Sequence, residues 1–257
     1  MGFERANAFV NMGLDEAILV SRVEDSVPNT VRLYGWRPSA VSIGRFQKLE
    51  QEVYLDKCHE LGVDVVRRAS GGGTVYHDAE GEVTYCVVAK VSDLGAFDVT
   101  QVYDRVYLGI AEALHILGVE SDFNSGDAKN CPNLTVHGKK ISGSSQANKG
   151  GCVLQHGTLL LRKDLEKMFT LLRVPWAKTC MEVVTVAKNK ITSLQDELGA
   201  GVSTSTVCGA MRKGFEKAFG DQFLDGKLAP EELNLGERLC KEKYSTNDWS
   251  FLGKSSL

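Results

Sequence analysis

The chain has 257 residues, of which 43% are hydrophobic and 25% are charged, and its formal net charge is −3. This composition is typical of a globular chain, and the length suits one large domain or one domain with a small appendage. The slight negative charge argues against nucleic acid as the main partner, and the absence of any apolar run of about 18 residues argues against a membrane span.

The N-terminal part of the chain predicts one helix followed by a group of short strands. Residues 1–11 include Glu4 and Arg5 and lack the long apolar segment of a secretory signal. The hydrophobic pattern predicts a helix over residues 11–23, strands over 31–34 and 40–44, a short helix over 54–61, and strands over 63–67, 74–76 and 83–90.

The second half begins with the clearest helix of the chain, over residues 98–117. Its apolar residues recur at steps of three and four, Asp98 is placed to cap its N-terminus, and Gly118 follows its end. The elements expected after it are strands over residues 134–137, 140–146 and 152–161, and helices over 165–172, 192–198, 204–219 and 231–242.

The expected strands arrive in groups and do not alternate regularly with helices. This order predicts an α+β fold with a mixed, mainly antiparallel central sheet and flanking helices, and it argues against a doubly wound parallel sheet. A helical part begins near residue 190. We expect it to belong to a single domain over residues 1–257.

A glycine-rich motif, RRASGGGTVYHD over residues 67–78, is the first candidate site. Each of its three consecutive glycines loses backbone freedom worth roughly 0.5–1 kcal/mol relative to alanine, so glycine is expected where the chain turns sharply or approaches a ligand. Backbone N–H groups in such a turn bind anions, and Arg67 and Arg68 add positive charge. The alternative is a tight hairpin with two surface arginines. The motif is neither a Walker loop nor a GxGxxG loop.

A second candidate, GKKISGSSQ over residues 138–146, places a lysine at the start of an expected strand. Strand alternation predicts that Lys140, Ser142 and Ser144 share one face. A lysine beside hydroxyl groups suits a polar pocket, where its charge neutralises a carboxylate or a phosphate. The alternative is a solvated edge strand, in which lysine is common.

A third motif, QHGTLLL over residues 155–161, places His156 beside Gly157. Glycine within a strand lets another group approach closely, which is consistent with a ligand site. The alternative is a structural histidine whose hydrogen bonds are satisfied inside the protein. The five histidines of the chain show no metal-ligand spacing.

The seven cysteines are odd in number, scattered and never spaced as CxxC. We therefore expect reduced thiols in a cytoplasmic protein, without a disulfide framework or a structural zinc site. Cys131 lies in a polar loop shortly before Lys140. A thiolate beside a lysine is a candidate acyl-transfer nucleophile, whereas most cysteines are inert.

The three motifs occur in one chain in this order, and together they resemble the lipoate–protein ligase A family. This family lies within a larger group that includes biotin ligases and octanoyltransferases, and the resemblance implies a catalytic domain like those of class II synthetases and biotin ligases. Segments 34–47 and 243–249 agree with the family as well. The resemblance therefore covers almost the whole chain.

The resemblance implies an ATP-dependent ligase that works in two steps. The carboxylate of lipoate, or of octanoate, attacks the α-phosphate of ATP with Mg²⁺ present, and pyrophosphate leaves. A lysine of a lipoyl-carrier protein, such as an E2 domain or a glycine-cleavage H protein, then attacks the acyl-adenylate. Lys140 is implied to be the catalytic residue, whose charge stabilises the acyl carboxylate and the phosphate.

The same resemblance implies a set of binding residues, motif by motif. The residues implied for the acyl-adenylate and ATP are Arg68, Ser70, Gly71, Gly72, Gly73, Thr74, Val75, Tyr76, His77, Ser142, Gly143, His156 and Gly157. The residues implied at the rim of the lipoate channel are Gly44, Phe46 and Gln47.

The chain departs from the family pattern in two places. Many members have Asn-Asp-Leu before the pocket lysine, with the acid helping to hold magnesium, whereas this chain has Pro132, Asn133 and Leu134. Asp127 is the candidate substitute as a magnesium ligand. Many members also carry an accessory C-terminal domain, which we do not expect in this chain, so a separate accessory subunit is a further expected partner.

Two other functions stay open at this point. The first is a cysteine-dependent octanoyltransferase that needs no ATP, in which Cys131 is the nucleophile and must lie on the ligand side of the pocket. The second is a non-catalytic subunit that binds lipoyl groups. A biotin ligase is less consistent, because residues 44–47 lack the glycine- and arginine-rich biotin loop.

Overall fold

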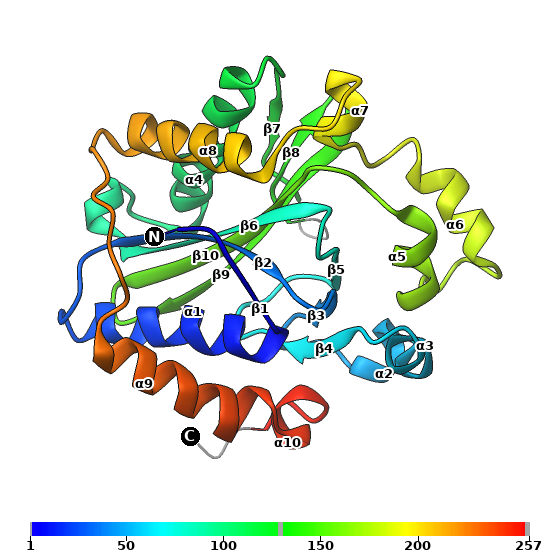
Figure 1. Cartoon of the computed structure of the whole chain (residues 1–257), viewed down its shortest axis with the longest axis horizontal. Coiled ribbons are helices and arrows are strands. Elements are labelled where there is room, and N and C mark those ends of the chain that lie inside the picture. Colours follow the sequence, from blue (N-terminus) through cyan, green and yellow to red (C-terminus); the bar gives the residue numbers. More distant parts are fainter. Residues whose placement is uncertain (1, 128–130, 255–257) are drawn as a thin grey trace.

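The structure, a computed structural model, describes residues 2–127 and 131–254. Within these residues, the central sheet has seven strands in the order β1 (Glu4–Ala6), β2 (Thr30–Trp36), β6 (Glu82–Lys90), β10 (Cys152–Leu160), β9 (Lys139–Lys149), β8 (Asn133–Val136) and β7 (Asp122–Asn124) (Figure 1). β1 runs parallel to β2, and the other neighbouring strands pair antiparallel.

A smaller sheet lies beside the first and carries the start of the glycine motif. Among the described residues it has three strands, in the order β4 (Asp64–Arg67), β3 (Ala40–Ile43) and β5 (Val75–His77). β3 pairs parallel with β4 and antiparallel with β5. Two short helices, α2 (Leu49–Glu52) and α3 (Leu55–Glu60), lie next to β4 and share an apolar cluster with this sheet (Figure 1).

Helices cover both faces of the central sheet (Figure 1). On one face, α4 (Val99–Ile116) packs against α8 (Thr204–Phe219), and on the other α1 (Ala8–Val23) packs against α9 (Pro230–Leu239). The remaining helical elements are η1 (Ser92–Leu94), α5 (Leu165–Leu171), α6 (Cys180–Ala187), α7 (Leu194–Leu198), η2 (Cys240–Tyr244) and α10 (Asn247–Ser250). No helix in residues 2–127 and 131–254 is long and apolar enough to cross a membrane.

The central sheet separates two apolar cores because alternate side chains of each strand point to opposite faces. In β10, Val153 and Leu159 pack toward α4 and α8, whereas Cys152 and Leu154 pack toward α1. The residues between Leu154 and Leu160 on the α1 side include His156, which is polar and buried. A polar site therefore interrupts the apolar core on this face.

The predicted fold class is confirmed, since the sheet is mixed and mainly antiparallel with flanking helices. Asp98 caps α4 as expected, with its side chain accepting from the Gln101 N–H. α1 begins at Ala8, earlier than expected, because the Asn7 side chain caps it. The short strands β1 and β7 and the helix α6 were not expected. Their few residues carry too little periodicity to be recognised.

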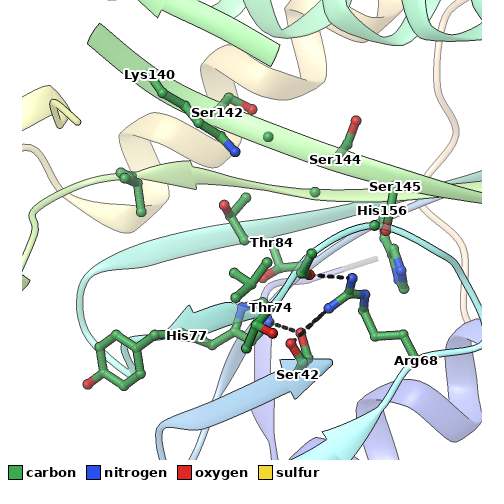
Figure 2. Close-up of a pocket in the computed structure, with 18 of the residues that line it drawn as sticks. Ser42, Arg68, Thr74, His77, Thr84, Lys140, Ser142, Ser144, Ser145 and His156 are labelled. Atoms are coloured by element: carbon green, nitrogen blue, oxygen red, sulfur yellow. Dashed lines mark hydrogen bonds between the residues drawn. The ribbon is translucent and has the colours of Figure 1, made fainter. Parts of the chain in front are cut away.

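The expected face of β9 is wrong. Ser142 pairs with Leu134, but Lys140 pairs with the next residue, Thr135, so β9 has one extra residue at this point. Such a bulge shifts the alternation of side chains. Lys140 consequently lies on the opposite face from Ser142 and Ser144, and Figure 2 shows its side chain pointing into a pocket while the two hydroxyls point away.

Candidate active site

A pocket lies where the glycine loop, residues 71–73, faces β9 and β10. Its volume is about 310 Å³. The expected site residues that line it are Arg68, Gly72, Gly73, Thr74, Val75, Tyr76, His77, Lys140, Ser142, Gly143, His156 and Gly157. The fold therefore brings the three sequence motifs to one cavity.

The other expected residues do not line this cavity. They are Gly44, Phe46, Gln47, Ser70 and Gly71. Ser70 is buried behind the glycine loop, and Phe46 is 85% exposed on the outer surface. Their contact with an acyl-adenylate or with lipoate stays a prediction.

Gly44 supports the glycine loop from behind. A Cβ atom at Gly44 would lie 2.0 Å from the carbonyl oxygen of Gly72, so only glycine fits at this position. Gly72 itself has a φ of +84°, which side chains disfavour. The Gln47 Oε1 atom accepts hydrogen bonds from the Gly44 N–H at 2.8 Å and from the Thr74 hydroxyl at 3.2 Å. Residues 44–47 and the glycine loop are thus held as one unit.

Arg68 is a buried cation surrounded by neutral oxygens. Its guanidinium donates to the carbonyl groups of Ser42, Gly71 and Gly73 at 2.9 Å each, and to the Ser42 hydroxyl at 2.8 Å. No carboxylate of the described residues lies within 4.0 Å of it. Burial lowers the pKa of Arg68 to about 10. The alternative of surface arginines is wrong, and the unpaired charge of Arg68 faces the pocket.

Arg67 points to the other side and joins the loop to the C-terminal segment, residues 243–253. Its guanidinium donates to the carbonyl groups of Gly44, Arg45 and Gln47 and to those of Trp249 and Phe251. The Trp249 indole N–H donates back to the Arg67 carbonyl at 2.8 Å. The end of the chain therefore stabilises the loop behind the pocket.

His77 belongs to a buried chain of hydrogen bonds that ends at Arg68. Its Nδ1 lies 2.7 Å from Glu82 Oε1, and its Nε2 lies 2.7 Å from the Ser42 hydroxyl oxygen. A neutral His77 that donates to Glu82 accepts at Nε2, so Ser42 donates to it and accepts from Arg68. The imidazole also stacks on Trp36, with ring centroids 4.0 Å apart. His77 is a support for Arg68.

His156 occupies a similar place on the other side of Arg68. Its Nδ1 lies 3.0 Å from Asp15 Oδ2, and its Nε2 lies 2.6 Å from the Ser70 hydroxyl oxygen. Burial lowers the pKa of His156, although Asp15 opposes this change. Burial alone would raise the pKa of Asp15, but His156 and Arg32 together bring it below its usual range. Both imidazole nitrogens are occupied, as expected for a structural histidine.

Lys140 stands opposite Arg68 on the wall formed by β9. A Cβ atom at Gly143 would lie 2.5 Å from Cε and 2.6 Å from Nζ of Lys140, so glycine makes room for this amine. The side chain is accessible from the pocket, yet surrounding protein atoms lower its pKa by desolvation. Among the described residues, no carboxylate pairs with it. It is a second unpaired cation at the cavity.

Cys131 lies on the wall of the same pocket. Its Sγ atom is 3.9 Å from the position that a Cβ atom of Gly72 would occupy. Burial lowers the pKa of Arg68 and of Lys140, and the nearby Cys131 partly offsets this lowering in both. A nucleophilic thiol was expected to lie on the ligand side, and Cys131 does.

Residues 7–216 match the model of the lipoyl protein ligase A/B catalytic domain. The chain belongs to this family. It is 34% identical to the octanoyltransferase LipM of Anoxybacillus flavithermus, over 94% of this chain and 93% of that one. It is 30% identical to the octanoyltransferase LipM of Bacillus subtilis, over 96% of this chain and 95% of that one. The predicted family is confirmed.

Solved structures of lipoate ligases have the same fold as this member of the lipoyl ligase family. The chain superposes with a TM-score of 0.85 and 26% identity on a bi-partite lipoate protein ligase from Thermoplasma acidophilum, over 99% of this chain and 97% of the other. The TM-score is 0.83, again at 26% identity, for a lipoate-protein ligase A bound with ATP, over 98% and 96% of the two chains.

Apolar side chains also line the pocket, which the sequence motifs did not reveal. The apolar residues that line it are Met12, Trp36, Leu160, Met168, Phe169, Leu172 and Ile191. They come from α1, β2, β10, α5 and the segment before α7, so no local pattern links them. The family member therefore has a cavity that is lined by two cations and by apolar side chains.

The expected magnesium ligand, Asp127, is exposed. The described residues contain no group of three or more His, Cys, Asp or Glu side chains that could hold a metal ion. Magnesium binding at Asp127 stays a prediction for this family member.

Proposed function

We propose that this chain is an octanoyltransferase, which moves an octanoyl group from a thioester donor to a lysine of a lipoyl-carrier protein without ATP. The observation that carries the proposal is the position of Cys131 on the wall of the pocket that Arg68 and Lys140 also line. The names of the relatives at 34% and 30% identity support this choice over ligation.

The first step forms an acyl-enzyme. The Cys131 thiolate attacks the carbonyl carbon of the donor thioester, a new carbon–sulfur bond forms, and the bond to the donor sulfur breaks. The donor leaves as a thiolate and takes a proton, for which the Lys140 ammonium is the nearest candidate. Arg68 and Lys140 supply positive charge for the oxyanion that develops on the carbonyl oxygen.

The second step transfers the octanoyl group to the carrier. The neutral amine of the carrier lysine attacks the Cys131 thioester, an amide bond forms, and the Cys131 thiolate is released. Lys140 accepts the proton that the amine loses and is restored to its charged form. The apolar side chains of the cavity bind the octanoyl chain, since burying alkyl groups from water stabilises the complex by about 0.8 kcal/mol per CH₂.

A second candidate is the ATP-dependent ligation of lipoate or octanoate through an acyl-adenylate. The similarity to an ATP-bound ligase, with a TM-score of 0.83, supports this alternative. Unpaired cations such as Arg68 and Lys140 fit a carboxylate and a phosphate as well as an oxyanion. In this case a separate accessory subunit is an expected partner, and the Thermoplasma neighbour is described as bi-partite.

One set of reactions separates these functions. The purified chain is incubated with a lipoyl domain of an E2 protein or with an H protein, and either with octanoylated acyl carrier protein or with octanoate or lipoate, ATP and magnesium. Mass spectrometry then detects the acylated carrier. We expect octanoyl transfer from the thioester without ATP, whereas transfer that requires ATP would establish the ligase.

The Cys131→Ala variant tests the nucleophile in the same assay. We expect it to lose transfer by on the order of a thousandfold or more, as for other enzymes that lose their nucleophile. Cys208→Ala, which removes a half-buried thiol from α8, is the matched control and should keep its activity. Undiminished transfer by Cys131→Ala would exclude the acyl-enzyme, and ligand binding without any transfer would favour a non-catalytic subunit.

A further inference from the structure

A buried tyrosine of α4 contacts the loop that carries Cys131. We propose that Tyr107 is a positioning residue, whose hydroxyl holds Cys131 beside Lys140 and Arg68. This inference rests on the proposed function, because it concerns the nucleophile of that reaction.

The Tyr107 hydroxyl connects strand β9 to this loop. It donates a hydrogen bond to the Pro132 carbonyl at 2.8 Å and accepts one from the Ser144 hydroxyl at 2.9 Å. The Ser144 oxygen in turn accepts from the Gln155 amide at 3.0 Å. The residue after the nucleophile is therefore joined through Tyr107 to two central strands of the sheet.

The neighbouring carbonyl is held in a similar way. The Asn133 side-chain amide donates to the Cys131 carbonyl at 3.2 Å. Asn133 begins β8 and pairs with Gly143 in β9, so the central sheet holds the residue that donates this bond in place. An amide side chain can donate this bond, whereas a carboxylate could not. Two consecutive carbonyl groups, of Cys131 and Pro132, are thus fixed.

The ring and the hydroxyl of Tyr107 contact different neighbours, so their roles can be tested separately. The residue is 1% exposed, and its ring stacks on Tyr103 and contacts Phe123 with centroid distances of 6.0 and 5.4 Å. A phenylalanine would keep these contacts. It would lose both hydrogen bonds of the hydroxyl, to the Pro132 carbonyl and from the Ser144 hydroxyl, so the hydroxyl can be tested without the ring.

The test compares Tyr107→Phe with Tyr85→Phe. Tyr85 is equally buried, and its hydroxyl lies 3.3 Å from the hydroxyl of Ser142 in β9. It makes no hydrogen bond to residues 131–133, all of which the structure describes. The first measurement is the alkylation rate of Cys131 by iodoacetamide at neutral pH, followed by peptide mass spectrometry. It needs no acyl transfer, so it tests the inference even where the proposed function fails.

We expect Tyr107→Phe to slow the alkylation of Cys131 by about threefold or more, because a displaced thiolate loses the two neighbouring cations. Cys131 is already exposed, so a looser loop gives the reagent no additional access. In the transfer assay we expect kcat to fall by about tenfold, with KM within about twofold of the wild type. Tyr85→Phe should leave both rates within about twofold.

Wild-type alkylation and turnover in Tyr107→Phe would overturn the inference, and so would equal losses in both tyrosine variants. If Tyr107→Phe does not fold, Asn133→Ala is the second variant, since Asn133 lies at the surface end of β8. It removes the bond to the Cys131 carbonyl and should slow alkylation in the same direction. An unchanged rate in Asn133→Ala would then count against the proposal.

Discussion

The two walls of the pocket differ in how completely their polar groups are bonded. On the wall formed by the glycine loop, β3 and β5, Arg68 donates to several buried oxygens, and His77 bonds at both ring nitrogens. On the wall formed by β9 and the Cys131 loop, Lys140 and Cys131 are accessible and have no carboxylate partner among the described residues. The polar groups of the first wall stabilise the fold, whereas the polar groups of the second wall are accessible to a substrate.

The strongest test of this difference is Lys140→Ala. We expect kcat/KM for acyl transfer to fall by about a thousandfold, roughly 4 kcal/mol of transition-state stabilisation, because the oxyanion loses a cation. The midpoint of thermal unfolding should stay close to that of the wild type, because no described carboxylate depends on this amine. The measurement is a kinetic assay beside a thermal melt.

Lys139→Ala is the matched control for that variant, since it removes the neighbouring lysine of the same strand. It should retain activity. Normal turnover by Lys140→Ala would show that Lys140 is not the catalytic residue. A lower unfolding temperature, with normal activity of the folded fraction, would show that Lys140 stabilises the fold instead.

The opposite wall is tested by Arg68→Met. The variant should lower the free energy of unfolding by about 3 kcal/mol, because buried carbonyl groups of Ser42, Gly71 and Gly73 lose their donor. Urea unfolding followed by circular dichroism measures this change. Activity should fall as well, since the glycine loop loses its support. A variant as stable as the wild type would show that the two walls do not differ.

A smaller effect is expected from pH. Burial lowers the pKa of His156 in the folded chain, so below about pH 6.5 the unfolded chain binds a proton at this residue before the folded chain does. Stability is then lost as the pH falls below that value, with a slope of at most about 1.4 kcal/mol per pH unit. The lowered pKa of Asp15 adds a separate loss only below its unfolded value of 3.8.

His156→Gln checks this expectation. Urea unfolding is measured at several pH values between 5 and 7, and the variant should show a flatter dependence than the wild type, because glutamine does not titrate there. Identical slopes in the two proteins would indicate that His156 is not the group responsible.

Residue order within the three motifs was enough to predict that residues of all three meet at one site. Gly72, Lys140 and His156 line one cavity, as the motifs indicated. The face of Ser142 and Ser144 was not predictable, because the bulge in β9 depends on its pairing with β8 and not on the strand's own pattern. Local periodicity gives no sign that a strand has one residue more than its partner at the point of pairing.

The apolar residues of the cavity could not be predicted from the sequence either. Met12, Trp36 and Phe169 lie on separate elements, and only packing brings them together. The C-terminal segment is another case, since Trp249 supports the glycine loop through Arg67, which is 182 positions away. Bonds over such distances in the chain depend on tertiary structure.

The amino-acid sequence by itself determined the family, the fold class and the three motifs with their charged residues and glycines. These features depend only on residue type and on the order of residues along the chain. Tertiary structure alone decided which face of β9 points into the pocket, which histidines are supports, and that a loop cysteine lies beside two cations. The physical reason is that burial and the approach of opposite charges depend on neighbours brought together from distant parts of the chain.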